Sequence, residues 1–404
     1  MTFLRDLKDE KNWSEALYLA AFSCYVIFFY LQSTTFTMNV PGILYSIVRG
    51  VLFFTALTRI VIFRKEIKAP VAVALAAFTG LGIFYFVSRG DLMVLDAALI
   101  TAGALNVSFK RIGVLYVFIG TFISILALIC SQTGIIPDYT FSTNYGVDEK
   151  LRHSFGIIYP TDCFAHIFYL VSTYFLIRWK RITYVEIAVA GVLFGVVYYF
   201  TSARADMMAA VLVLLVVLVL KLTGFKKFAI PDKVQKVLSV VLMPISAAAI
   251  LVVTSLYDPL NAHLNKLDVM TSYRLSLGKT GLDLYGYTLL GAPNFAENGN
   301  ANGGIRNYSY NFYDSAYIKY LFKYGIVMLL VLFLVYALIG LRLNTSKMFY
   351  GMVFIGVITL SFIVEHHMLE LSYNITLLVL TADISTILQS SPYINKNRRN
   401  GIIT

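Results

Sequence analysis

Arginine residues outside the apolar runs, or at their ends, are the residues of this sequence best suited to chemistry. Arg89, Arg152 and Arg204 lie near the ends of apolar segments, and Arg274 lies in a long polar stretch. A guanidinium group is a planar fork that binds phosphate oxygens in pairs and keeps its charge when partly desolvated. Several of them around one cavity would bind a lipid diphosphate, whereas a single one would snorkel to lipid phosphates or pair locally.

Arg49 is a secondary candidate for the same site. It lies deep in the apolar run 42–63, where an ionisable side chain normally faces a cavity or a charged partner. Lys319 and Lys323, one helical turn apart, extend the positive lining or snorkel.

A group of acids and imidazoles lies between the last two apolar segments. It contains Glu365, His366, His367 and Glu370, and helical spacing would place His366 beside Glu370. In a cleft, a Glu or His here would accept a proton from a sugar hydroxyl. The ordinary alternative is a solvated turn, and the adjacent histidines are weak evidence for a metal because a third ligand has no obvious source.

Two further residues are candidate bases. His153 follows Arg152, and Asp314 precedes the apolar run 315–341. Chemistry alone does not rank them against Glu365, His366 or His367.

The composition of the chain indicates which kind of fold positions these residues. The chain has 404 residues, of which 58% are apolar and 14% charged, too hydrophobic a mixture for one soluble core. We predict an all-α polytopic membrane protein that forms a single domain, 1–404, with about 12 transmembrane helices. The predicted segments are 14–32, 42–63, 69–87, 92–107, 112–133, 155–177, 184–199, 207–222, 237–256, 315–341, 349–364 and 371–388.

Charge predicts the orientation of these helices. The 33 Lys and Arg residues exceed the 22 Asp and Glu residues, and most lie in short loops on one side, including the basic loop 221–236. The positive-inside rule therefore places both termini and this loop in the cytoplasm, and it explains the excess better than nucleic-acid binding does. The basic residues left outside are Arg89, Lys150, Arg152, Arg204, Lys266, Arg274, Lys279 and Arg306.

The polar stretch 257–313, between the ninth and tenth segments, is predicted to be one large outward loop. Its Asn- and Gly-rich part, 294–307, is typical of irregular chain. Apolar residues within 267–282 recur at helical spacing and predict a short helix on the membrane surface. Several polar aromatic or amide residues are suited to stacking on sugars or to packing: Tyr273, Tyr285, Tyr308, Tyr310 and Asn311.

Other motifs are missing from the sequence. There is no P-loop, HExxH or CxxC, so we expect no cofactor and no metal. Cys24, Cys130 and Cys163 lie in or beside apolar segments and predict no disulfide framework. The charged N-terminus runs into a full-length apolar segment, and we expect no cleaved signal peptide.

Four short stretches carry a family likeness. They are Arg152-His153-Ser154-Phe155-Gly156 with Tyr159-Pro160; Thr201-Ser202-Ala203-Arg204; Arg274 with the later Gly291-Ala292-Pro293-Asn294-Phe295; and Asp314-Ser315-Ala316-Tyr317. With these, and with many helices and one large loop in its second half, the chain resembles the Wzy-type O-antigen and capsular polysaccharide polymerases and, more distantly, the O-antigen ligases. Ligase-like members often have a His-Asn pair where this chain has Asp314-Ser315.

The resemblance implies a glycosyltransferase at the outer face of the bacterial plasma membrane. Such an enzyme moves a growing chain from undecaprenyl diphosphate onto a newly flipped repeat unit, without a nucleotide sugar or metal. Arg152, Arg204 and Arg274 would hold the diphosphate, with Arg49 and Arg89 as further candidates. The implied partners are the lipid-linked donor and acceptor, membrane lipid, and other assembly proteins such as a flippase or chain-length regulator.

Three alternatives remain open. A ligase differs in its acceptor, and a flippase or other transporter would carry charge through its helices on both sides. The halves of the chain show no repeat, which disfavours a duplicated transporter. A membrane acyltransferase would rely on Asp162 and His166, whose spacing is more simply a local contact within a helix.

Overall fold

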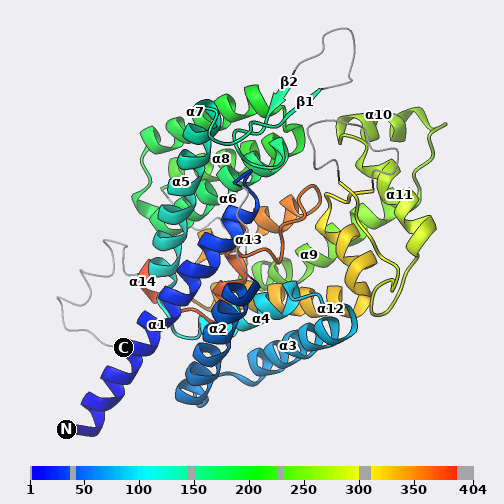
Figure 1. The fold of residues 1–404 in the computed structure, drawn as a ribbon. Helices are drawn as coiled ribbons and strands as arrows, with labels where there is room; N and C mark the ends of the chain where they lie inside the picture. The colour runs from blue at the N-terminus through cyan, green and yellow to red at the C-terminus, as the bar shows by residue number, and fades with distance from the viewer. Residues whose placement is uncertain are drawn as a thin grey trace.

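Long apolar helices dominate the structure, a computed structural model that describes residues 2–36, 42–142, 151–224, 231–299, 311–346 and 348–388. Within these ranges, 8 helices are long and apolar enough to cross a membrane. They are α1 (Thr2–Gln32), α2 (Gly42–Phe63), α3 (Ala69–Arg89), α5 (Phe109–Gln132), α7 (Tyr184–Thr201), α8 (Arg204–Leu222), α9 (Asp232–Ser255) and α12 (Ala316–Thr345) (Figure 1). The prediction of an all-α multi-pass membrane protein is confirmed at this level.

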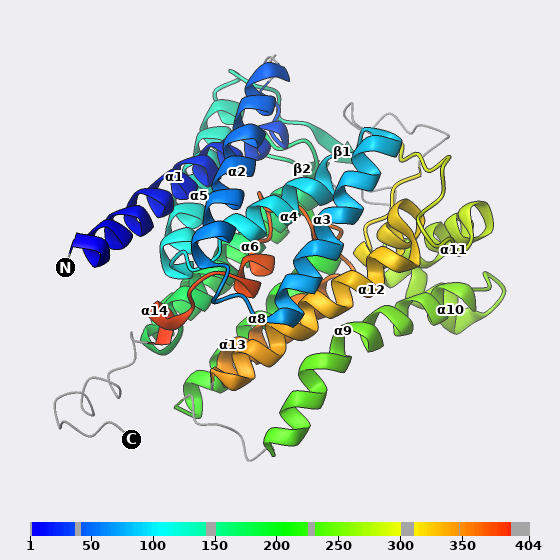
Figure 2. The same ribbon diagram turned by 90° about the horizontal axis from the view of Figure 1, so that it is seen from below.

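Shorter elements lie between and beside these helices. The helical ones are α4 (Met93–Gly103), α6 (Pro160–Arg178), η1 (Trp179–Arg181), α10 (Ala262–Met270), α11 (Arg274–Tyr285), α13 (Phe349–Ser361), η2 (Thr376–Leu380) and α14 (Ser385–Leu388). Strands β1 (Thr140–Ser142) and β2 (Leu151–His153) form a small antiparallel hairpin. Helix α12 packs against α9 and α3, and α6 packs against α5, α7 and α8 (Figures 1 and 2).

The prediction of a last transmembrane helix over residues 371–388 is wrong. Its residues form turns, the short η2 and the short α14, and residues 371–382 are all buried. An apolar run enclosed by other helices has the same composition as one that faces lipid, so composition did not separate them. Irregular chain at membrane depth is tolerated where protein encloses it. We call residues 362–384 the buried return segment.

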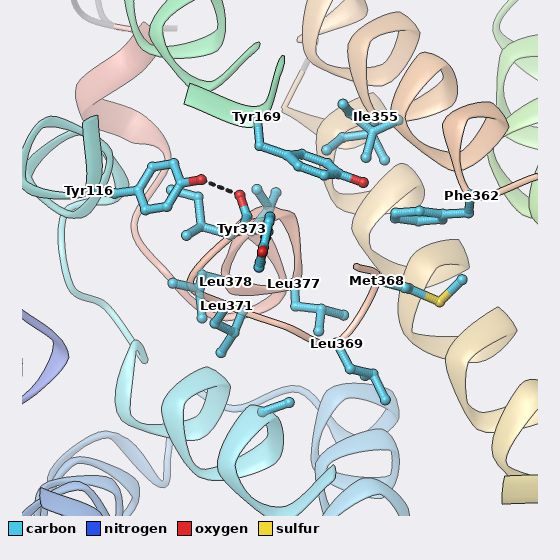
Figure 3. Packing of buried hydrophobic residues seen from close by; sticks show 14 of the residues in the cluster. Tyr116, Tyr169, Ile355, Phe362, Met368, Leu369, Leu371, Tyr373, Leu377 and Leu378 are labelled. Carbon is cyan, nitrogen blue, oxygen red and sulfur yellow. Dashed lines mark hydrogen bonds between the residues drawn. The ribbon is translucent and has the colours of Figure 1, made fainter. Parts of the chain in front are cut away.

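Hydroxyl and guanidinium groups satisfy the backbone of the buried return segment. Tyr116 donates to the carbonyl of Tyr373, and Figure 3 shows Tyr373 packed among apolar side chains near Tyr169. Tyr320 donates to the carbonyl of His366 at 2.9 Å and accepts from the Leu369 N–H at 3.1 Å. The guanidinium group of Arg342 donates to the carbonyls of Val379, Leu380 and Ala382.

Helix α12 is broken at Gly325, and the polar stretch fills the break. Gly325 has φ 80°, and the N–H groups of Ile326 and Val327 bind the carbonyls of Thr288 and Leu289 at 2.9 and 3.0 Å. Arg89 donates to the carbonyls of Lys323, Leu290 and Gly291. The stretch 288–292 is therefore fixed to α12 by backbone bonds and by one arginine from α3.

The stretch 267–282 is largely helical, as predicted, but it is divided between two helices. Tyr273 has φ 64° and separates α10 from α11. The Asp268 carboxylate accepts from the N–H groups of Leu275 and Ser276 at 2.9 and 3.0 Å, which satisfies the start of α11. Residues 286–299 and 311–315 are irregular, which agrees with the prediction for 294–307 over its described part, 294–299. Residues 300–310, with Arg306, Tyr308 and Tyr310, lie outside the described ranges, as does Lys150.

A glycine exchange tests the break in α12. A Cβ at Gly325 would lie 2.3 Å from the Gly291 nitrogen and 2.5 Å from the Leu289 carbonyl oxygen, and φ is positive. We expect Gly325→Ala to destabilise the protein by about 2 kcal/mol or more, since backbone strain alone costs about 1–3 kcal/mol. Thermal unfolding in detergent measures the change. Gly195→Ala in α7 is the control, because its Cβ would meet nothing within 4 Å; equal Tm values for both variants would contradict this account.

Candidate active site

The beginnings of several helices meet the buried return segment at the end of the molecule that carries α11. Asp162 is the third residue of α6 and Asp206 the third residue of α8. The N–H group of Ala316, the first residue of α12, donates to the carbonyl of Glu365 at 3.1 Å. Helix N-termini carry partial positive charge, so carboxylates and anionic ligands are stabilised here.

Six side chains form what we call the acid–imidazole cluster. They come from α6, α8 and the buried return segment: Asp162, Asp206, Glu365, His366, His367 and Glu370. The fold therefore brings together the beginnings of two helices and a segment that follows them far along the chain.

His367 is the centre of this cluster. Its Nδ1 lies 3.0 Å from Oε2 of Glu370, while its Nε2 lies 3.8 Å from Oδ1 of Asp162 and 3.9 Å from Oε2 of Glu365. Burial would raise the pKa of Glu370, but the contact with His367 outweighs it and lowers that pKa. The prediction that Glu370 would pair with His366 is wrong, because the irregular backbone presents His367 instead.

A stack of rings fixes the orientation of His367. Tyr30 of α1 stacks on His166 at 3.8 Å between centroids, His166 on Tyr373 at 3.7 Å, and Tyr373 on His367 at 3.6 Å. The ring of His366 also contacts that of His367, with 3.9 Å between centroids, but it is tilted by 38° and lies outside the stack. Burial, and then the charge of His367, lower the pKa of His366, which favours a neutral imidazole.

Glu365 and Asp206 form a buried pair of carboxyl groups. Both side chains are almost fully buried, and the charge of Asp206 acts on Glu365. Burial, followed by the charge of Asp206, raises the pKa of Glu365 well above its ordinary value. Glu365 therefore keeps its proton to a higher pH than an ordinary carboxyl group does.

Arg274 closes the cluster on the side of α11. Its side chain is only 8% exposed, with NH2 3.1 Å from Oδ2 of Asp314 and NH1 donating to the Thr271 carbonyl at 3.1 Å. Arg274 and Asp314 line a small pocket together with Phe312 and Ser315. With 22% of its side chain exposed, Asp314 is more accessible than Glu365, His366 or His367.

The lysines of α12 are paired with acids. Lys319 lies 2.9 Å from Oε2 of Glu297 and over the ring of Phe312, and Lys323 lies 2.7 Å from Oδ2 of Asp91. Burial would raise the pKa of Asp91, but Lys323 outweighs it and lowers that pKa. These pairs link the polar stretch and the α3–α4 turn to α12.

Two of the predicted arginines lie beside the cluster. Arg152 of β2 donates through Nε to the carbonyl of Thr201, the last residue of α7, at 2.7 Å. Arg204 is exposed and begins α8, two residues before Asp206. Arg152 and Arg204 thus meet at the α7–α8 turn, and Arg274 acts electrostatically on Asp206 from the other side.

Three predicted site residues have other roles in the fold. The hairpin holds His153 in place, with Nδ1 2.7 Å from Oδ2 of Asp138. Arg49 forms an ion pair with the buried Asp96 at 2.9 Å, because α2 crosses α4 there. Arg89 binds the backbone carbonyls at the break in α12. We therefore remove His153, Arg49 and Arg89 from the candidate site.

Other sequence interpretations need correction as well. His166 does not contact Asp162 one turn away; its Nε2 lies 2.7 Å from the hydroxyl of Ser33, and Asp162 faces His367. Within the polar stretch, the amide of Asn311 donates to Tyr285, which packs on Phe295, so both serve packing.

Asp162 and Asp206 are the site residues that sequence reasoning missed. Each is an acid in the first turn of an apolar helix, at Pro160-Thr161-Asp162 and Arg204-Ala205-Asp206. An acid at the same position of two helices is a usable signal, because a carboxylate near an apolar segment requires a partner.

Comparison of the chain with protein-family models, with curated proteins and with solved structures gives no match.

The pH dependence of stability tests the assignment of Glu365. The folded state holds its proton more tightly than the unfolded chain does, so this stabilisation is complete below pH 4.5 and is lost as pH rises through the raised pKa. We expect Glu365→Gln to gain stability relative to wild type as pH rises above 4.5. The gain in free energy of unfolding should approach about 1.4 kcal/mol per pH unit until the pH passes the raised pKa of Glu365.

Glu370→Gln is the matched comparison and should change in the opposite direction. The lowered pKa of Glu370 stabilises the fold above the ordinary carboxyl range, and this is lost as pH falls. Thermal unfolding of both variants in metal-free detergent buffer, from about pH 4 to pH 8, measures the difference. Parallel curves for wild type and Glu365→Gln would show that Glu365 titrates normally.

Proposed function

We propose that the protein is a glycosyltransferase that polymerises oligosaccharide repeat units carried on a lipid diphosphate, at the outer face of a bacterial plasma membrane. The observation that carries the proposal is that Arg152 and Arg204 both lie at the α7–α8 turn, where α8 and its Asp206 begin, and that Arg274 of α11 acts electrostatically on the same Asp206. The likeness to Wzy-type polymerases in the stretches around Arg152, Arg204, Arg274 and Asp314 supports it.

Diphosphate binding is assigned to the arginines around the cluster. Arg204 is exposed, Arg152 is half-buried, and both stand at the α7–α8 turn. Arg274 is buried with Asp314 and shifts its charge toward the diphosphate when the ligand arrives. Cations placed beforehand around the leaving diphosphate stabilise the charge that develops as the glycosidic bond breaks.

Asp314 is the proposed general base. The hydroxyl oxygen of the acceptor sugar attacks the anomeric carbon of the donor, the bond from that carbon to the diphosphate oxygen breaks, and the lipid diphosphate leaves with the electron pair. The Asp314 carboxylate takes the hydroxyl proton. Among the candidate bases kept in the site, Asp314 is the most exposed and lines the small pocket with Arg274.

An arginine exchange tests diphosphate binding. Arg204→Lys keeps the charge and loses the fork, and because Arg204 is exposed the fold should be unaffected. We expect polymerisation to fall by about a hundredfold or more, so that cells display mainly single repeat units at the surface. The length distribution of surface polysaccharide measures this, with protein level and Tm as checks.

Arg111→Lys is the control. Arg111 pairs with Glu15 near the start of α5, so this exchange should leave the polysaccharide at its normal length. Normal polymer in Arg204→Lys would remove the diphosphate assignment.

Deletion of the protein separates the polymerase from the alternative functions. Precursor retained on the inner leaflet would indicate a flippase, and full-length polymer that stays on its lipid would indicate a ligase.

A second exchange tests the base. Asp314→Asn is isosteric and cannot accept the proton, so we expect transfer to slow by about 10²- to 10⁴-fold with little change in donor binding. Asp314→Glu should restore part of the rate. Purified protein with a lipid-diphosphate-linked donor and a free acceptor measures both; an unchanged rate in Asp314→Asn would exclude this residue as the base.

A further inference from the structure

We infer that Asp162, His366 and His367 form a binding site for one divalent metal ion of the zinc type. One ligating atom from each residue can be chosen so that all three lie within 4.8 Å of one another. Adjacent histidines alone are weak evidence for a metal, but Asp162, from α6, supplies the third ligand that the sequence did not reveal.

The orientation of His367 is that of a metal ligand. Its Nδ1 is bound to Glu370 at 3.0 Å, which fixes the ring and leaves Nε2 as the remaining nitrogen. His367 is 1% exposed, and its Nε2 has no hydrogen-bond partner among the described residues. An imidazole that binds a metal through one nitrogen usually has its other nitrogen held by a carboxylate in this way.

The distances from His367 also fit a shared cation. Its Nε2 lies 3.8 Å from Asp162 and 3.9 Å from Glu365, too far for hydrogen bonds. Ligands at about 2.0–2.2 Å from a tetrahedral metal are about 3.4 Å apart, so movements of a few tenths of an ångström bring these atoms into place.

The charge of the cluster favours a dication. Asp162, Asp206, Glu365 and Glu370 gather around the imidazoles, and Arg274 acts on this group from one side. Buried carboxylates require a proton, an ion pair or a metal. Two imidazoles with one or two carboxylates suit Zn²⁺, Co²⁺ or Mn²⁺, whereas Mg²⁺ and Ca²⁺ prefer oxygen ligands alone.

Cobalt binding to the full-length protein tests this inference without any assay of transfer. The protein is purified in detergent, stripped with a chelator and titrated with Co²⁺, with d–d absorption as the readout. We expect one equivalent to bind with an intense visible band, and Zn²⁺ but not Mg²⁺ to displace it. His153→Gln is the control, because His153 lies in the hairpin with Asp138.

Asp162→Asn and His366→Gln should each lower the affinity for Co²⁺ by about tenfold or more and abolish the visible absorption band. His153→Gln should keep the wild-type affinity and the band. Each variant is used only if it elutes as a folded protein on size-exclusion chromatography. Because the two variants lie in different segments, the test still stands if one of them does not fold. No stoichiometric binding by wild type, or equal binding by wild type and both variants, would overturn the metal site. Either result leaves the proposed transfer reaction open, because no sugar is present.

Discussion

Peptide groups inside a membrane protein must all find partners, and the buried return segment shows how this chain meets that requirement without a helix. Tyrosine hydroxyls and the Arg342 guanidinium take the place of helical hydrogen bonds along residues 366–382. The candidate site depends on this arrangement, because only an irregular backbone presents Glu365, His367 and Glu370 to α6 and α8 together. A regular helix there would distribute the same side chains around its axis.

The helix beginnings set the electrostatics of the site. Asp162 and Asp206 each occupy the first turn of a helix, where the helix dipole offsets part of the cost of burying an acid. Arg274 begins α11 and reaches the same region from the polar stretch, held by Asp314. Cationic and anionic groups are thus interleaved in this region, with Arg274 paired to Asp314 and acting on Asp206.

Hydropathy predicted most of the helices within a few residues of their ends, because length and apolar composition are what a bilayer selects. It failed at 371–388, since burial inside protein and burial in lipid favour the same side chains. Arg274, Asp314 and the 365–367 group stand out in the sequence as charges beside apolar segments, and the structure places them close together, while their role in a site stays a prediction. Arg49 and Arg89 lie elsewhere, because their partners, Asp96 and backbone carbonyls, depend on helix crossings that are not local in sequence.

The ring stack from Tyr30 to His367 has a mechanical consequence. The stacked rings from Tyr30 to His367, at centroid separations of 3.6 to 3.8 Å, leave no room for one member to turn without displacing its neighbours. Helix α1 is therefore coupled to the imidazoles at van der Waals contact, although most of the chain lies between them in sequence. Tyr30 of α1 thus packs through His166 and Tyr373 against His367, so a displacement of α1 would press on the buried return segment through these three ring contacts.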